Sequence, residues 1–291
     1  MVLVRRLSVI AALSGACACS LISGAADLEV VPDAPSDASV VPPETSTPPP
    51  RSVDSGGVDF DDAAADATSE DGGSAPSGCG NDPSLVLYMR FDEPIGSTGA
   101  QHCAPGLVGR LTDGAAFVAA GKVGGAVDTT AGYVDLATPP ALAITGALTV
   151  AAWIRPSVLP TTGADYVFGR RGATAGPGYR LGLRPQGVTF IAVSDQGVNA
   201  EAIGPTVPVG QWTHIAGVYA PGVAARVYVG GKLEKDQPAT NVAALGGLVL
   251  PTRVGMRGDG EPATNFRGAV DELRVYKRAL DAAEIAALAT P

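Results

Sequence analysis

From residue 84 onward, short apolar runs alternate with turns that contain Gly, Pro, Asp and Asn. Closely spaced runs of this kind indicate antiparallel β-strands and predict a sandwich or barrel. Runs that are apolar on both parities, such as 147–156, are typical of central strands covered on both faces. We expect strands in the segments LVLYMRF (85–91), GYVDL (132–136), ALTVAAWIRP (147–156), DYVFGRR (165–171), YRLGLR (179–184), VTFIAVSD (188–195), WTHIAGVYA (212–220), ARVYVGGKL (225–233), RVGMRG (253–258) and AVDELRVYK (269–277).

Near the C-terminus the pattern changes to a helical one, in the stretch LDAAEIAAL (280–288). Asp281 and Glu284 form a D-x-x-E capping box, in which the Asp side chain accepts a hydrogen bond from the N3 amide. Leu280, just before the cap, can pack onto Ile285 as a hydrophobic staple. The pattern therefore predicts one short helix that lies against the sandwich.

Residues 1–19 have the pattern of an export signal. Two arginines precede the apolar stretch LSVIAALSGA, which is shorter than the roughly twenty residues that span a bilayer. The letters ALSGACACSLISG resemble a bacterial lipoprotein signal, in which a Cys after small residues receives lipid. We favour Cys19 as that residue, with Cys17 or a plain secretory peptide as alternatives. In each case we expect export to the cell envelope, with the lipidated form anchored at the outer membrane or cell surface.

Residues 20–78 are predicted to be a disordered acidic linker. Residues 25–78 contain nine Asp, three Glu and one Arg, and they are rich in Pro, Ser and Ala. Such a segment cannot bury enough apolar surface to offset the entropy lost on ordering. Residues 79–291 hold seventeen basic and seventeen acidic side chains, so they offer no excess positive charge. We therefore exclude nucleic acid as a partner.

Cys79 and Cys103 are the only cysteines after the predicted signal. An oxidising compartment permits them to form a disulfide. A metal site is less favoured, because two Cys and two His in this region lack a ligand spacing such as C-x-x-C. We predict a disulfide between Cys79 and Cys103 that fastens the first strand of the domain.

The order of the motifs along residues 84–288 resembles the laminin-G-like jelly-roll domains of the concanavalin A-like lectin/glucanase superfamily. The motifs that carry the resemblance are LVLYMRFDE, GKVGGAVDTTAGYVDL, LTVAAWIRPS, GYRLGL, GQWTHIAGVYAPGVAARVYVGGKL, RVG and FRGAVDELRVYKRALDAAEIAAL. The resemblance implies that residues 79–291 form an all-β domain, in which two antiparallel sheets make a jelly-roll sandwich with a short C-terminal helix. It also implies a function in binding or adhesion.

Glycosidases of this superfamily carry their two carboxylates on one strand as E-x-D-x-x-E, where alternate residues share a face. No such run occurs in this chain. Asp271 and Glu272 are adjacent, and neighbouring residues on a strand point to opposite faces. A G-x-S-x-G nucleophile elbow is also absent from the sequence. We therefore assign no catalytic residue and expect no enzymatic activity, with a glycoside hydrolase as the less favoured alternative.

Asp271 stands among apolar residues, where a carboxylate requires hydrogen bonds, an ionic partner or a cation. The resemblance implies that an Asp near the start of the last strand can hold a structural Ca²⁺. Oxygen ligands from the first strand would complete that site, and Asp92 and Glu93 occupy this place. The alternative is a set of turn hydrogen bonds to Asp271, with an ion pair between Arg274 and either Glu272 or Asp92.

Trp153, Trp212 and His214 are candidates for a sugar-stacking face, because aromatic rings suit the apolar faces of saccharides. The alternative is that they are framework residues of two central strands. Polar and glycine-rich loops are candidates for a ligand rim. These loops are 160–166, 194–201 and 257–265, and the last contains the candidate ligand-binding residue Asp259.

These features together predict a non-catalytic, surface-displayed module that recognises a glycan or a cell-surface protein. Its contact with the membrane would be through the lipid anchor alone, and Ca²⁺ would be a structural cofactor. The alternative is a structural or adhesive module without a discrete small ligand.

Overall fold

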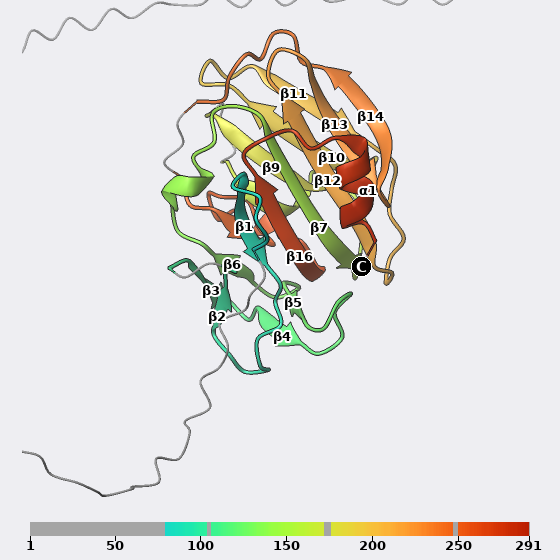
Figure 1. Cartoon of the computed structure of the whole chain (residues 1–291). Coiled ribbons are helices and arrows are strands. Elements are labelled where there is room, and N and C mark those ends of the chain that lie inside the picture. The colour runs from blue at the N-terminus through green and yellow to red at the C-terminus, as the bar shows by residue number, and fades with distance from the viewer. Residues whose placement is uncertain (1–78, 104–105, 172–175, 247–249, 291) are drawn as a thin grey trace, which may run out of the picture. The chain divides into compact units, whose positions relative to one another are not determined.

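The structure, a computed structural model, describes residues 79–103, 106–171, 176–246 and 250–290 (Figure 1). The predicted signal segment, both candidate lipidation cysteines and the predicted acidic linker lie outside the described residues. Within these four ranges, no helix is long and apolar enough to cross a membrane.

Two antiparallel sheets of eight strands each build the domain, as the jelly-roll resemblance predicts. Sheet A comprises β1 (Leu85–Met89), β4 (Ala116–Val118), β5 (Ala126–Asp128), β7 (Leu148–Pro156), β12 (Thr213–Ala220), β13 (Ala224–Val229), β14 (Lys232–Pro238) and β16 (Gly268–Tyr276). Sheet B comprises β2 (Gly99–Gln101), β3 (Val108–Thr112), β6 (Tyr133–Asp135), β8 (Asp165–Arg170), β9 (Gly178–Arg184), β10 (Gly187–Val193), β11 (Asn199–Ile203) and β15 (Arg253–Val254).

The strand order explains how distant parts of the chain become neighbours. Sheet A runs β14-β13-β12-β7-β16-β5-β4, and the first strand, β1, pairs with the last, β16. Sheet B runs β11-β10-β9-β8-β15-β6-β3-β2. The 3-10 helices η1 (Pro140–Leu142) and η2 (Pro262–Thr264) lie in connections between strands. The pairing of β1 with β16 brings the entry of the domain onto the strand that carries the two adjacent carboxylates.

Each predicted strand segment contains a strand of the structure. The sequence pattern does not indicate the short strands β2, β3, β4, β5 and β11. The predicted rim loop 194–201 needs a correction, because strand β11 begins inside it at Asn199. Ala200 and Ala202 face the core there, and alanine is a weak indicator of a strand.

The hydrophobic core lies between the two sheets. On β7, the alternate residues Leu148, Val150, Ala152 and Ile154 are fully buried in it. The intervening residues of the same strand face outward, and part of that outer face is covered as well. This double coverage explains why the β7 segment is apolar on both parities.

Helix α1 (Ala282–Leu288) covers part of the outer face of sheet A, over β12 and β13 in Figure 1. The predicted capping box is confirmed, because Asp281 accepts the Glu284 amide and Glu284 accepts the Asp281 amide, each at 2.9 Å. Leu280 and Ile285 share a second apolar cluster with Tyr228 of β13. The helix therefore covers one part of the outer face of sheet A.

Candidate functional site

Strand β16 contains a β-bulge between residues 271 and 274. Asp271 lies opposite Trp153 of β7, whereas Arg274 lies opposite Ala151, so β16 advances three residues while β7 advances two. Glu272 has a backbone φ of 50°, in the left-handed region that non-glycine residues seldom adopt. An inserted residue of this kind interrupts the alternation of a strand.

The bulge places both carboxylates of the adjacent pair on the outer face of sheet A. Val270 and Leu273 are three positions apart, yet both lie in the core between the sheets. The side chains of Asp271 and Glu272 both lie away from that core. The expectation that they point to opposite faces is therefore wrong, because the bulge resets the period of two.

Asp271 is fully buried, and its carboxylate holds a turn in place through hydrogen bonds. Its Oδ2 accepts the backbone N–H groups of Lys122 and Val123 at 2.8 and 2.9 Å, and its Oδ1 accepts the N–H of Glu272 at 2.7 Å. Burial raises the pKa of Asp271 to about 7, although these three donors act in the opposite direction. Because both carboxylate oxygens already accept hydrogen bonds and the side chain is buried, Asp271 has no open path to a ligand.

Glu272 belongs to a closed network with Tyr88 and Arg274. The Tyr88 hydroxyl donates to Glu272 Oε2 at 2.8 Å and accepts from Arg274 Nη2 at 2.8 Å, while Arg274 pairs directly with Glu272. The Arg274 guanidinium also lies 4.1 Å from the centre of the Tyr88 ring. The turn hydrogen bonds and the Glu272–Arg274 ion pair are the arrangement predicted as the alternative to calcium.

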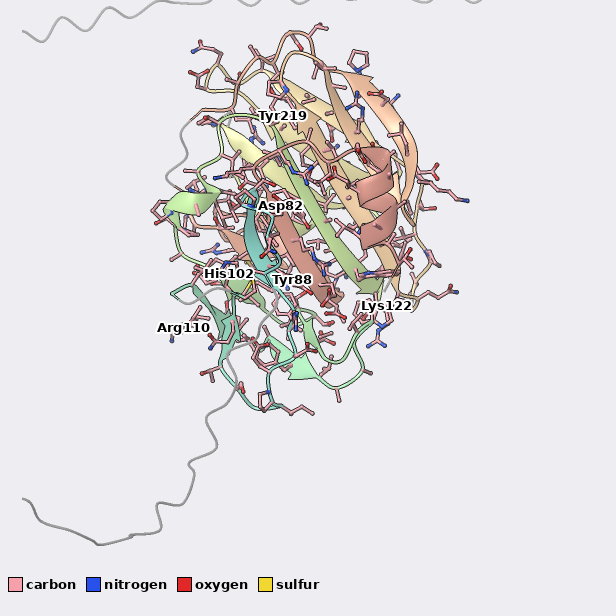
Figure 2. All side chains as sticks on the ribbon, viewed as in Figure 1. Asp82, Tyr88, His102, Arg110, Lys122 and Tyr219 are labelled. Carbon is pink, nitrogen blue, oxygen red and sulfur yellow. A yellow bond between two sulfur atoms is a disulfide. The ribbon has the colours of Figure 1, made fainter. Side chains whose placement is uncertain are left out.

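An open groove lies on the outer face of sheet A beside α1, and we call it the sheet A groove. Its first part has a volume of about 340 Å³, and an adjoining second part of about 430 Å³ shares Tyr88, Arg90 and Asp92 with it. Figure 2 views this face, with Tyr88 and Lys122 labelled. The first part is lined by Tyr88, Arg90, Asp92, Val123, Trp153, Glu272, Arg274, Ala287, Leu288 and Thr290. Volumes of this size are typical of small-molecule sites.

Trp153 and His214 form a cross-strand pair on this face. Their rings meet edge to face, with centroids 5.5 Å apart, and the Lys122 ammonium lies 4.4 Å from the Trp153 ring centre. His214 is 1% exposed, and burial, together with the nearby charge of Arg274, lowers its pKa to about 4. His214 is therefore a neutral residue beneath the groove, while Trp153 is part of the groove wall.

Trp212 and Asp259 lie apart from the sheet A groove lining. Trp212 precedes β12, and the Arg155 guanidinium lies 5.0 Å from the centre of its ring. Asp259 accepts Arg257 Nε at 2.7 Å in the loop after β15 and borders a different recess, with Tyr133. Of the four predicted ligand-binding residues, Trp153 and His214 are therefore in contact, whereas Trp212 and Asp259 lie elsewhere in the domain.

The three predicted calcium ligands do not converge. Asp92 accepts the N–H of Gly125 at 2.7 Å, and Glu93 accepts the N–H of Gln101, whereas Asp271 holds the Lys122 turn. In the described ranges, the single group of three candidate ligand side chains within 4.8 Å of one another is a Cys–His–Cys cluster. The carboxylates therefore do not fit one shared Ca²⁺ site, and calcium binding stays a prediction.

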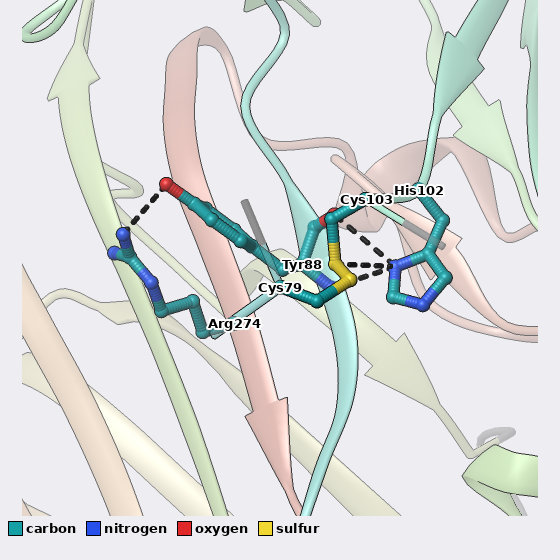
Figure 3. The surroundings of a disulfide bond; sticks show 5 residues. All are labelled: Cys79, Tyr88, His102, Cys103 and Arg274. Atoms are coloured by element: carbon teal, nitrogen blue, oxygen red, sulfur yellow. Dashed lines mark hydrogen bonds between the residues drawn. A yellow bond between two sulfur atoms is a disulfide. The ribbon is translucent and has the colours of Figure 1, made fainter. Parts of the chain in front are cut away.

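The Cys–His–Cys cluster contains the predicted disulfide, which links Cys79 and Cys103 with a Cα–Cα distance of 5.2 Å (Figure 3). His102 Nδ1 accepts the N–H of Tyr88 at 3.0 Å and lies 3.6 Å from Cys103 Sγ. The Tyr88 carbonyl in turn accepts the N–H of Cys103 at 3.1 Å. The disulfide therefore fastens the strand from which Tyr88 reaches Arg274 in the groove.

Tyr88, Arg90 and Arg274 line the groove, although the sequence pattern assigns none of them to a binding site. A signal for Tyr88 and Arg90 exists in LVLYMRF. Leu87, Met89 and Phe91 are core residues, so the two residues between them must face outward. The place of Arg274 depends on the bulge in β16, and the sequence carries no comparable sign of that bulge.

The chain belongs to the concanavalin A-like lectin/glucanase superfamily, because the model of this family matches residues 128–286. Comparison with curated proteins gives no match.

Several solved structures are similar to this fold. The binding domain of Paraclostridial Mosquitocidal Protein 1 is 13% identical with a TM-score of 0.57, over 71% of this chain and 52% of that one. Domain 4 of AbnA, a GH43 extracellular arabinanase from Geobacillus stearothermophilus in complex with arabinotriose, is 23% identical with a TM-score of 0.51, over 71% and 98%. The ligand binding domain of botulinum neurotoxin serotype D, in complex with N-acetylneuraminic acid, is 12% identical with a TM-score of 0.56, over 71% and 50%. The chain spans about half the length of the first and third of these structures.

Proposed function

We propose that the domain is a non-catalytic binding module for a glycan and that the sheet A groove is its binding site. One observation carries this proposal: Tyr88, Arg90 and Asp92 line both parts of the sheet A groove. A ring, a guanidinium and a carboxylate in one groove can contact the apolar face and the hydroxyl groups of a sugar.

Arg90 is the residue of this set with free hydrogen-bonding capacity. Its Nε is buried and has no hydrogen-bond acceptor among the described residues, and its guanidinium lies 5.3 Å from the centre of the Tyr88 ring. A buried donor without a partner costs free energy, which a ligand oxygen would recover. Asp92 offers an exposed carboxylate close by, and Leu288 adds an apolar wall.

The state of the two adjacent carboxylates supports a non-catalytic function. A retaining glycosidase requires two available carboxyl groups roughly 5 Å apart. Asp271 is buried under the Lys122 turn with both oxygens hydrogen-bonded, and Glu272 is paired with Arg274. The non-catalytic function is thus supported by the hydrogen bonds and the ion pair that occupy these carboxylates. The faces to which they point do not bear on it.

We further propose that the chain is exported and anchored by lipid at the cell surface. The signal-like first 19 residues and the small residues before Cys19 support this, and a disulfide is in keeping with an oxidising compartment. Cys19→Ala, compared with Cys17→Ala, should abolish incorporation of radiolabelled palmitate and partition into detergent. Unchanged labelling of both variants would contradict the lipid anchor.

A glycan array probed with the whole chain, with Ca²⁺ and with EDTA, tests the binding function. We expect binding to a defined set of oligosaccharides that Arg90→Ala weakens by about tenfold or more, the loss of one charge-assisted hydrogen bond. Arg110→Ala, on the exposed part of β3, is the matched control and should bind normally. A blank array under both conditions would contradict the glycan proposal and favour the structural or adhesive module. Binding that requires Ca²⁺ would support the calcium prediction.

A further inference from the structure

The outer face of sheet B carries a cluster of arginines that the sheet A groove does not use. On β9, Tyr179, Leu181 and Leu183 are core residues, so Arg180 and Arg184 face outward. We call the side chains of Arg171, Arg180, Arg184 and Arg257 the sheet B arginine cluster.

Three of these arginines have acceptors in the protein. Arg184 pairs with Glu201 of β11 at 2.7 Å, and Arg257 pairs with Asp259 at 2.7 Å. Arg171 Nε donates to the carbonyl of Gly176 at 2.9 Å. The carboxylates that neutralise the cluster therefore sit on its two flanks.

Arg180, at the centre, differs from the other three. It is 6% exposed, its Nε has no hydrogen-bond acceptor among the described residues, and no carboxylate there lies within ion-pair distance of it. Its guanidinium stacks on Tyr166, 4.5 Å from the ring centre. Burial, followed by the charges of Arg171, Arg257 and Arg184, lowers the pKa of Arg180 to about 10. A buried cation without an anion is costly, and an anion beside Arg180 would offset that cost.

An open recess of about 380 Å³ adjoins the cluster, and Tyr166, Arg184 and Arg257 line it. The facing wall comes from two loops predicted as a ligand rim, 160–166 and 257–265, and includes the carboxylate of Glu261. The third predicted loop ends in β11, at the Glu201 that pairs with Arg184. All three loops thus meet around the arginines.

We propose that the sheet B arginine cluster binds the carboxylate of an acidic sugar, such as a uronic or sialic acid, in a second site on the sheet opposite the sheet A groove. A guanidinium presents a planar fork of donors that matches a carboxylate. Tyr166 offers an aromatic surface beside it for the sugar ring. Glu261 opposite would accept from sugar hydroxyls, and it disfavours ligands that carry negative charge along their whole length.

Titration of the whole chain with galacturonic acid and with N-acetylneuraminic acid, each compared with its methyl ester, tests this site. Esterification removes the charge and keeps the ring, so we expect the affinity to fall by about tenfold or more. Arg180→Gln should give the same loss, and Arg180→Lys a smaller one, because lysine keeps the charge without the fork. Thermal melting of each variant checks that it folds.

Arg226→Gln is the matched control, since Arg226 lies on β13 of sheet A and pairs with Asp236. It should leave the affinity for the acids unchanged. An independent readout is the Nε–Hε resonance of Arg180 in the unsubstituted chain, which should shift with the acids and not with the esters. Equal affinity for acid and ester, an unshifted Arg180 resonance, or no binding of either acid would overturn the proposal.

Discussion

The buried imidazole of His214 makes a quantitative prediction about stability and pH. The ordinary pKa of histidine is about 6.5. In the folded protein burial, with a contribution from the charge of Arg274, lowers the pKa of His214 to about 4. Between these two pH values the unfolded chain binds a proton that the folded chain does not. The contribution of His214 to the free energy of unfolding is therefore complete above about pH 6.5 and is lost as the pH falls toward 4.

The magnitude follows from the shift. A displacement of about 2.5 pKa units corresponds to about 3 kcal/mol, at 1.36 kcal/mol per unit. Asp271 acts in the opposite direction over an overlapping range, because burial raises its pKa to about 7. Its contribution is present at low pH and is lost as the pH rises through 7. The pH dependence of the unsubstituted protein is consequently the sum of two opposed slopes.

A difference curve separates the two contributions. Urea unfolding of the unsubstituted protein and of His214→Phe, repeated across this pH range, gives the difference in free energy of unfolding at each pH. Phenylalanine keeps the ring contact with Trp153 and cannot be protonated. We expect the difference to change by about 3 kcal/mol between pH 6.5 and 4, with the unsubstituted protein losing stability. A flat difference curve would contradict the lowered pKa of His214, as would an NMR titration in which the His214 ring signal moves near pH 6.5.

Three further changes test the elements that hold the site. Replacing Cys79 and Cys103 with serine should lower the free energy of unfolding by about 3 kcal/mol, because the disulfide closes a loop with a sequence separation of 24. Calorimetry under oxidising conditions measures this loss. Tyr88→Phe removes the hydroxyl that contacts Glu272 and should cost about 1–3 kcal/mol in urea unfolding, and a change below the error would contradict the network. Asp281→Ala should cost about 1 kcal/mol through loss of the helix cap, whereas Asp281→Asn should cost less because asparagine still caps; equal losses would argue against capping.

The sequence predicted the fold well because its main signals are local. The strand segments, the capping box and the Leu280–Ile285 contact depend on residues a few positions apart. The short strands β2, β3, β4, β5 and β11 escaped prediction because alanine and glycine carry little strand signal. Their pairing also depends on partners elsewhere in the chain, as with β5, which lies beside β16.

The candidate site was less predictable for a physical reason. Its geometry depends on one inserted residue, Glu272, which turns an alternating strand into a face with two carboxylates. The apolar neighbours of Asp271 predict that this carboxylate needs partners. Those partners, however, are backbone amides of a turn nearly 150 residues away. Arg180 lies in a plainly alternating strand, and its lack of an acceptor becomes visible only when the surrounding strands are in place.

The central claim, glycan binding in the sheet A groove, is tested most directly by chemical-shift mapping of the whole chain with an oligosaccharide selected on the array. We expect a neutral glycan to shift the side-chain signals of Arg90 and of the Trp153 indole, together with the amides of residues 88–92. Signals of Arg180 and Tyr166 on sheet B should stay in place with that ligand. Shifts confined to sheet B, or saturable binding that leaves Arg90 and Trp153 unmoved, would contradict it.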